Sequence, residues 1–137
     1  MELRAWLYLP RNSVLAIVSL ISCFLASSEA KIYSRCEIVH LFQHNGLDGY
    51  WGYHLADWVC LAYYASDFNT AALDHETDRR NNNGIFQIYS WCWCNDYHTP
   101  VVNKCNIHCN DSLNTDLKED IACAMRIVRQ PQGLENC

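Results

Sequence analysis

The spacing of the cysteines is the feature that most limits how this chain can fold. Nine cysteines occur in 137 residues, and one of them, Cys23, lies in an apolar N-terminal stretch. The other eight are Cys36, Cys60, Cys92, Cys94, Cys105, Cys109, Cys123 and Cys137. An even number of cysteines in a short secreted chain predicts a disulfide framework. A zinc site made by the four cysteines of residues 92–109 is the alternative, and an oxidising compartment favours disulfides over it.

The N-terminal stretch has the features of a secretory signal peptide. Two arginines precede an apolar run over residues 14–26, and small residues then lead to an expected cleavage after Ala30. The run is shorter than the roughly 20 residues that a bilayer-spanning helix needs. A longer signal anchor would be interrupted by Pro10. The sequence therefore predicts a signal peptide over residues 1–30 and one secreted domain over residues 31–137.

The charge balance argues against nucleic acid as a partner. The formal net charge is −5 with neutral histidines. A negative chain is repelled at long range by the phosphate backbone. We therefore expect no nucleic-acid partner.

The apolar pattern predicts three helices and one hairpin. Helices are expected over Arg35–Asn45, Leu55–Ser66 and Leu117–Arg129. The Asn83–Gly84 dipeptide is a strong hairpin signal, and a strand is expected over Ile85–Tyr89. Helices combined with a small antiparallel sheet make an α+β domain.

Several segments in this order resemble the C-type lysozyme and α-lactalbumin family, glycoside hydrolase family 22. They are Lys31–Glu37, Asp57–Cys60, Asn83–Ile88, Trp93–Asp96 and Cys123–Val128. The resemblance covers the whole predicted domain and is strongest to the sperm acrosomal members of the family. It implies a disulfide-stapled α+β fold with a helical lobe and a small antiparallel hairpin lobe.

The resemblance also places two catalytic carboxylates, and this chain has neither. The general acid is expected at Ala65 and the second, ionised carboxylate at Asn82. A methyl group has no proton to give, and a neutral amide cannot form a glycosyl ester. Asp67 is a poor substitute, because two further residues along a helix rotate a side chain by about 200°. We therefore expect no catalytic residues and no ordinary hydrolysis.

The binding cleft of the family is expected to survive this loss. By resemblance, the residues that line it here are Asp74, Asn82, Gln87, Tyr89 and Trp93. The rings of Tyr89, Trp91 and Trp93 would share one face of an extended strand, where aromatic rings stack on sugars. Packing of Trp91 against the domain itself is an equally good explanation of that residue. A cleft tryptophan of the family is replaced by Cys92.

The resemblance implies ligands, a location and a role. The expected ligands are oligosaccharides or glycoproteins that contain N-acetylglucosamine. The acrosome or a secretory vesicle is the expected location, with an egg-surface partner and a role in sperm–egg adhesion. Residual glycoside hydrolase activity, a protein-interaction module and a poorly folded truncated isoform are the alternatives.

The resemblance further bears on disulfides, metal and the C-terminus. It implies the pairs Cys94–Cys109 and Cys105–Cys123, each worth about 2–4 kcal/mol. The family continues into another helix that carries two more cysteines, so the C-terminal part of the domain is expected to be missing. Cys36 and Cys60 then lack their partners, Cys92 and Cys137 can replace them, and the pairing of these four stays open. The calcium loop of some members falls at Asn114–Asp120, where Asn114 replaces an expected acid, so no cofactor or metal is expected.

Overall fold

The computed structural model describes residues 30–76, 80–97 and 101–131. Residues 1–29 of the predicted signal peptide and Cys137 lie outside the described residues. No described helix is long and apolar enough to cross a membrane.

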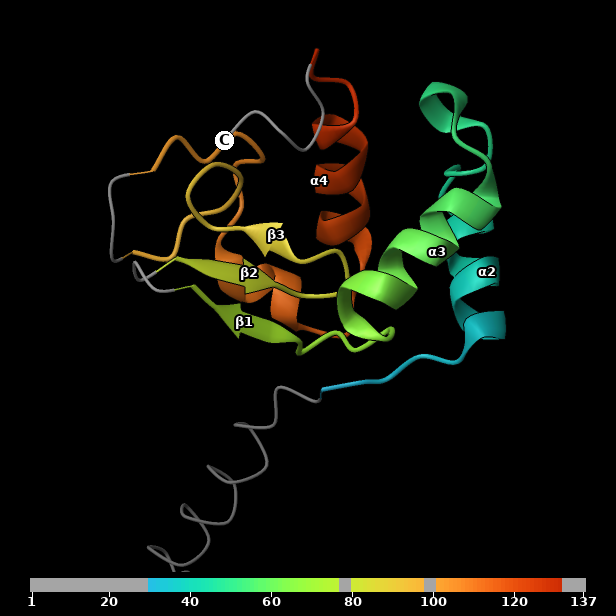
Figure 1. The fold of residues 1–137 in the computed structure, drawn as a ribbon, viewed down its shortest axis with the longest axis horizontal. Helices are drawn as coiled ribbons and strands as arrows, with labels where there is room; N and C mark the ends of the chain where they lie inside the picture. Colours follow the sequence, from blue (N-terminus) through green and yellow to red (C-terminus); the bar gives the residue numbers. More distant parts are fainter. Residues whose placement is uncertain (1–29, 77–79, 98–100, 132–137) are drawn as a thin grey trace, which may run out of the picture.

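Helices and a small sheet occupy different parts of the molecule (Figure 1). The helices α2 and α3 lie together on one side, and the three-stranded sheet lies on the other, with α4 near it. In chain order the elements are α2 (Arg35–His44), η2 (Tyr50–Gly52), α3 (Leu55–Ser66), β1 (Leu73–His75), β2 (Asn81–Asn83), β3 (Ile88–Tyr89), η3 (Cys109–Leu113) and α4 (Lys118–Ile127). The predicted α+β class is confirmed.

Local capping explains why α2 begins as predicted and ends one residue before the predicted bound. Ser34 and Glu37 form a capping box, in which each side chain accepts a hydrogen bond from the other residue's backbone N–H. The backbone N–H of Ser34 is the main cause that lowers the pKa of Glu37 to about 2. After the helix, Gly46 has a left-handed φ of 77°, and Leu47 N–H donates to the carbonyl of Phe42.

The ends of α3 and α4 also follow the sequence closely. The helix α3 spans Leu55–Ser66 as predicted, and Asp67 leaves it in a left-handed conformation with φ of 51°. The helix α4 is shorter than the predicted range by one residue at the start and two at the end. Asp116 supports its start, because its Oδ1 accepts a hydrogen bond from the N–H of Lys118 at 3.2 Å.

The strand predicted over Ile85–Tyr89 is wrong for most of its length. Only Ile88–Tyr89 is a strand, because Gly84 and Gln87 have left-handed φ angles of 74° and 52° and enclose a turn. A further turn begins after Tyr89. The aromatic residues of 89–93 therefore do not alternate along one strand, and the expected shared face is absent.

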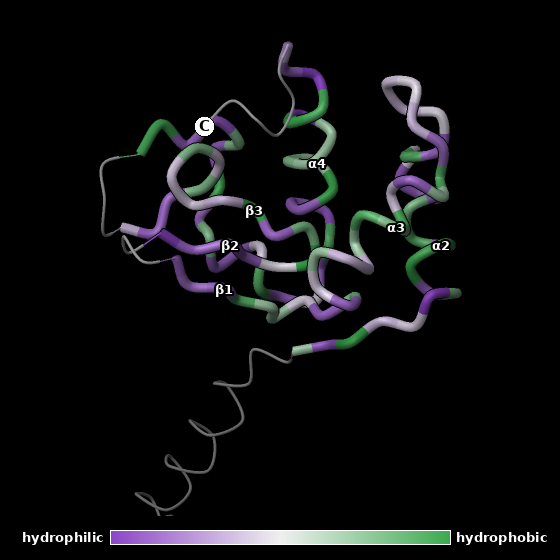
Figure 2. The backbone as a smooth tube through the Cα atoms, in the orientation of Figure 1, coloured by the Kyte–Doolittle hydropathy of each residue, from purple (hydrophilic) through white to green (hydrophobic). Residues whose placement is uncertain are grey.

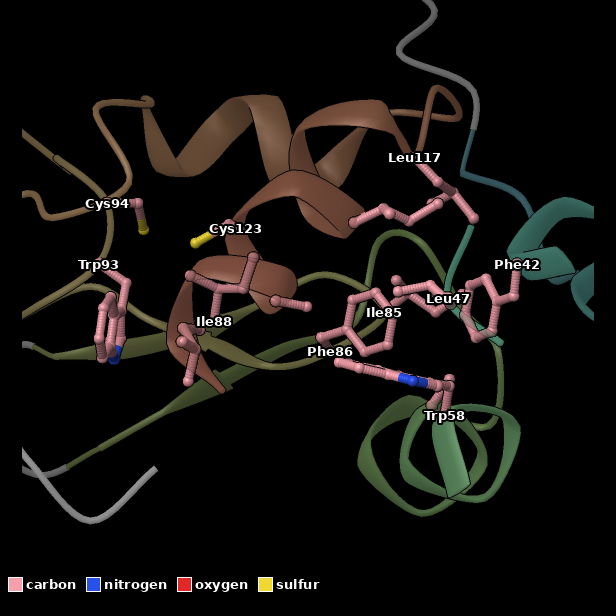
Figure 3. Close-up of a cluster of buried hydrophobic side chains, with 14 of the residues drawn as sticks. Phe42, Leu47, Trp58, Ile85, Phe86, Ile88, Trp93, Cys94, Leu117 and Cys123 are labelled. Atoms are coloured by element: carbon pink, nitrogen blue, oxygen red, sulfur yellow. The ribbon is translucent and has the colours of Figure 1, made fainter. Parts of the chain in front are cut away.

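The sheet itself is antiparallel, with the order β1-β2-β3. The strands β1 and β2 are mostly hydrophilic, whereas apolar residues recur along the helices (Figure 2). The core therefore lies between the helices and the turn after β2, and not on the faces of β1. Figure 3 shows Phe42, Ile85, Phe86 and Trp58 gathered in one cluster, in which the rings of Phe42 and Phe86 stack with centroids 5.4 Å apart.

Gly84 brings the hairpin turn against η3 and α4. A Cβ atom at this position would overlap the carbonyl oxygen of Ser112 and lie 2.8 Å from Oδ1 of Asp120. No other residue fits this close approach, and the positive φ favours glycine as well. The turn between β2 and β3 is thus held against two elements that come about 30 residues later.

The Asp120 carboxyl beneath this turn is fully buried. Neither of its oxygens has a hydrogen-bond partner among the described residues. Burial is the main cause that raises its pKa from 3.8 to about 8, and the negative charges of Glu119, Asp116 and Asp111 add to it. The buried group is therefore a neutral acid at neutral pH.

The disulfides confirm one part of the prediction and correct another. The pairs Cys94–Cys109 and Cys105–Cys123 are formed, and Cys92 is also disulfide-bonded. Cys36 and Cys60 are free and exposed, so the idea that Cys92 replaces a partner of either one is wrong. The reason is position, because Cys92 is buried after β3 while the two thiols lie on the outer faces of α2 and α3. The zinc alternative is wrong too, since three of its four cysteines form these two disulfides.

A groove of about 530 Å³ runs beside the free thiol of Cys60. Its lining is mainly apolar and includes Val39 of α2 and Leu55 and Val59 of α3. The helical side of the molecule thus exposes apolar surface among the described residues.

The buried acid makes a testable contribution to stability. Between about pH 4 and about pH 8 the native state holds a proton on Asp120 that the unfolded chain releases, so raising the pH favours unfolding. The free energy of unfolding should fall by about 1.4 kcal/mol per pH unit relative to Asp120→Asn, which stays neutral. Urea denaturation of both proteins at pH 5 and pH 7 measures this difference. Asp67→Asn, at an exposed carboxylate after α3, is the matched control, and an equal pH dependence in all three proteins would contradict the assignment.

Candidate functional site

Three predicted site residues form one row across the sheet. Asn82 in the central strand pairs with Asp74 of β1 on one side and with Tyr89 of β3 on the other. Directly opposed residues of an antiparallel pair point to the same face. Asp74 is exposed, and Asn82 and Tyr89 are partly exposed, so the row offers a carboxylate, an amide and a phenol to the same side.

The opposite face of the sheet has a different role. Leu73, Asn81 and Asn83 line a separate hollow of about 290 Å³ together with Asn95 and residues of η3. Asn83 is buried there and donates through Nδ2 to the carbonyl of Ile88 at 3.0 Å. This face therefore joins the sheet to the rest of the domain, and the row on the other face remains accessible.

The central residue of the row is an uncharged amide. The Nδ2 of Asn82 donates to Oε1 of Glu76 at 3.5 Å, a long hydrogen bond to an exposed carboxylate. The amide can still donate and accept hydrogen bonds, but it cannot ionise. Its chemistry is that of a binding group and not of a nucleophile.

Arg80 organises the aromatic end of the row. Its Nη1 donates to the hydroxyl of Tyr89 at 3.2 Å, and its guanidinium lies 4.3 Å from the ring centroid of Trp91. Trp91 keeps 38% of its surface exposed. No sequence pattern marks Arg80 as a site residue, because its contacts depend on the turn after β3.

Gln87 is committed to holding the hairpin. Its Nε2 donates to the backbone carbonyls of Ala72 at 3.1 Å and Gly84 at 2.9 Å. The side chain therefore links the segment before β1 to the turn before β3. Its amide donors are used within the chain, which leaves the carbonyl oxygen as the group that can face a ligand.

Trp93 does not belong to the exposed row. Its side chain is only 3% exposed, and it lies at the far end of the buried cluster from Trp58 (Figure 3). The ammonium of Lys104 lies 5.0 Å from its ring centroid. Trp93 is thus part of the buried core, and it offers almost no ring surface for stacking on a sugar.

The helical side of the site has no acid at the expected position. Ala65 is a partly buried methyl group near the end of α3. Its neighbour Ser66 donates to the carbonyl of Ile85 at 2.8 Å, which fixes the end of α3 to the hairpin turn. Asp67 lies beyond the end of the helix and is exposed.

The loop before α4 does not fit calcium. Oδ1 of Asn114 accepts a hydrogen bond from Asp116 N–H, and Oδ2 of Asp116 lies 3.4 Å from the ammonium of Lys118. Asp120 is buried and neutral at neutral pH, whereas calcium prefers several ionised oxygen ligands. Within the described residues, no group of three or more His, Cys, Asp or Glu could hold a metal ion.

Comparisons with known proteins agree with the fold. The family model for the C-type lysozyme/alpha-lactalbumin family matches residues 31–137. The chain is 57% identical over 125 residues to sperm acrosome membrane-associated protein 3 of Mus musculus, a match that covers 91% of this chain and 57% of that protein. It is 50% identical over 110 residues to lysozyme C-2 of Sus scrofa, covering 80% of this chain and 75% of that protein.

Solved structures show the same likeness. The crystal structure of lysozyme from Equus asinus matches with a TM-score of 0.72 and 41% identity, covering 75% of this chain and 81% of that chain. A canine milk lysozyme structure matches with a TM-score of 0.73 and 43% identity over the same shares. The fold expected from the resemblance is therefore confirmed.

The role of Gln87 predicts a specific cost for an acidic side chain there. Gln87→Glu removes both donated hydrogen bonds and places a carboxylate beside the carbonyls of Ala72 and Gly84. We therefore expect the free energy of unfolding to fall by about 1–3 kcal/mol. Gln43→Glu makes the same change at an exposed position and should cost less than about 0.5 kcal/mol. Urea denaturation at pH 7 compares the two variants. If both variants lost the same free energy of unfolding, the hydrogen bonds of Gln87 would not stabilise the hairpin.

Proposed function

This chain belongs to the C-type lysozyme/alpha-lactalbumin family, and we propose that it is a non-catalytic member that binds glycans containing N-acetylglucosamine. One observation carries this proposal. A row of exposed polar side chains crosses the sheet at Asp74, Asn82 and Tyr89, and its centre is a neutral amide where the family's chemistry requires a carboxylate.

Hydrolysis of a glycosidic bond needs two carboxyl groups with different tasks. One stays protonated and gives its proton to the leaving oxygen, and the other is ionised and stabilises or attacks the sugar. Ala65 and Asn82 occupy these positions and supply neither function. General acid catalysis alone is worth roughly 10²- to 10⁴-fold in rate, so its loss leaves little activity.

The row is well suited to bind a sugar without cleaving it. Asp74 accepts hydrogen bonds from hydroxyl or amide N–H groups, and Asn82 both donates and accepts. The ring of Tyr89 is held by Arg80, and the exposed part of Trp91 lies beside the same guanidinium. An aromatic surface next to hydrogen-bonding groups is the usual composition of a sugar site.

The biological setting follows from the relatives. Two of them are a sperm acrosome membrane-associated protein and a sperm acrosome-associated protein, both of Mus musculus. We propose that this chain is secreted into the acrosome or a secretory vesicle and recognises an egg-surface glycoprotein during sperm–egg adhesion. The match covers 57% of the sperm acrosome membrane-associated protein, so the proposed role concerns only the lysozyme-like domain that the two proteins share.

Residual glycoside hydrolase activity is the second candidate. It is favoured by Glu76, whose carboxylate lies 3.5 Å from the amide nitrogen of Asn82. A carboxylate next to the expected catalytic position is the minimum for any electrostatic help to a sugar cation. No acid stands at Ala65 to protonate the leaving group, which makes this candidate the weaker one.

Glycan binding is tested by titrating the secreted protein with tri-N-acetylchitotriose and following tryptophan fluorescence and calorimetric heat. We expect saturable binding that weakens by about five- to tenfold in Asp74→Ala, because one hydrogen bond to a charged group is lost. Asp67→Ala removes an exposed carboxylate outside the row and serves as the matched control. Absence of saturable binding in a folded protein would refute the proposal.

Catalysis is tested in a cell-wall lysis assay on three proteins. The natural chain should show no turnover above background, and the double variant Ala65→Glu, Asn82→Asp should gain a measurable rate, because it restores both carboxyl groups. Glu76→Gln distinguishes the second candidate. Turnover in the natural chain that disappears in Glu76→Gln would establish residual hydrolase activity and overturn the non-catalytic assignment.

A further inference from the structure

A basic hollow lies away from the row of the sheet, between the loop of residues 102–104 and the end of α4. It measures about 560 Å³ and is lined by Val102, Lys104, Arg126, Arg129 and Gln130. Three of these five side chains are cationic, in a chain whose formal net charge is −5. A cluster of three cations in a chain with a negative net charge indicates that this hollow attracts an anionic ligand.

The cations are not neutralised within the part of the chain that the structure describes. The ion pairs found there join Lys31 to Glu37 and Lys118 to Asp116, and none involves the hollow. No acidic side chain contributes to its lining. The three positive groups therefore face a space that is open to solvent and free of described carboxylates.

Two of the cations are held in place by the fold. Nη1 of Arg126 donates to the carbonyl oxygen of Lys104 at 2.7 Å, which orients the guanidinium along the wall. The ammonium of Lys104 lies over the buried ring of Trp93. A positioned guanidinium and ammonium lose less conformational freedom on binding an anion than two freely moving side chains do.

The hollow is joined to the sheet by the backbone. The N–H of Lys104 donates to the carbonyl of Cys92 at 2.8 Å, and the N–H of Cys105 donates to that of Trp93 at 3.1 Å. Residues 92 and 93 follow β3 and Tyr89 along the chain. The loop that carries Lys104 is thus attached by hydrogen bonds to the segment that follows the aromatic end of the row Asp74–Asn82–Tyr89.

We propose that this hollow binds an anionic substituent, a sulfate or a carboxylate, on the glycan that the domain recognises. The inference rests on the proposed glycan binding and adds to it the chemical class of the sugar. Arg126 and Arg129 supply planar donors that match the oxygens of sulfate or carboxylate, and Lys104 adds a third charge. The exposed side chain of Val102 provides an apolar wall for the adjoining sugar ring.

A small anionic group fits the hollow better than an extended polyanion does. Three cations can neutralise one or two anionic groups, while the net charge of −5 repels a long chain of phosphates. Nucleic acid is therefore the less favoured ligand, and a duplex DNA oligonucleotide in the same assay checks this. Binding of DNA in preference to the sulfated sugar would overturn the proposal.

The experiment compares sugars that differ only in charge, by calorimetry on the secreted protein. The probes are tri-N-acetylchitotriose, its 6-O-sulfated form and an oligosaccharide that alternates N-acetylglucosamine with glucuronate. We expect an anionic sugar to bind about tenfold more tightly than the neutral one at low salt, with a smaller advantage at about 300 mM salt. If only the sulfated form binds more tightly, the hollow recognises sulfate. If only the glucuronate form binds more tightly, it recognises carboxylate.

Substitutions test whether the higher affinity for anionic sugars arises at the hollow. Arg129→Gln should lower the ratio of anionic to neutral affinity about tenfold, and it tests the site without removing the Arg126 hydrogen bond to the backbone. Lys104→Gln should lower the same ratio. Arg35→Gln changes a basic residue of α2 outside the hollow and should leave the ratio as in the natural chain. A ratio that Arg129→Gln does not change would overturn the assignment.

The outcomes separate this inference from the proposed function. If the neutral sugar binds and the charged forms gain nothing, the hollow is not an anion site and the glycan-binding proposal stands. If only the anionic sugars bind and their binding depends on Arg129, the hollow is supported and binding of neutral N-acetylglucosamine oligomers is rejected. If none of the sugars binds, both proposals fail.

Discussion

The close approach of Gly84 to Ser112 and Asp120 is the contact on which the placement of the sheet depends. The missing side chain allows the turn after β2 to rest on the backbone of η3 and on a buried acid of α4. Two disulfides act between the same regions, because Cys94 follows β3, Cys109 begins η3 and Cys123 lies in α4. One backbone contact and two covalent links therefore make the sheet, η3 and α4 a single unit.

This unit decides which side chains of the hairpin are available for binding. When the turn is fixed, one face of β2 turns toward η3 and buries Asn83, and the other face presents Asn82 beside Asp74 and Tyr89. Gln87 adds to the same constraint by donating to two backbone carbonyls. The proposed sugar site is thus a consequence of how the opposite face is packed.

Prediction from the sequence succeeded where the signals were local. The helices begin and end within two residues of the predicted bounds, because the capping box at Ser34 and the glycine at residue 46 act over a single turn. The strand and the aromatic stripe after Gly84 were predicted too long. The left-handed conformation of Gln87, which a glutamine rarely adopts, shortens the strand, and its reason lies in hydrogen bonds to Ala72 and Gly84.

The candidate site was only partly visible in the sequence for the same reason. The resemblance placed Asp74, Asn82 and Tyr89 in one region, and the structure brings them into one row. Trp93 was expected among them and is buried instead. Arg80 was missed because its contacts depend on the turn after β3. The basic group of Lys104, Arg126 and Arg129 was missed because residues up to 25 positions apart meet only in the tertiary structure.

The amino-acid sequence by itself determined the helices and the resemblance to the family, and that resemblance implied two disulfide pairs and the loss of the carboxylates at Ala65 and Asn82. These features depend on residue identity and on spacing along the chain. Only the tertiary structure decided which of the aromatic residues reach solvent, which cysteines stay free and where the cations gather. Exposure and proximity depend on packing between distant segments, and in this protein that packing is set by a glycine against a carbonyl.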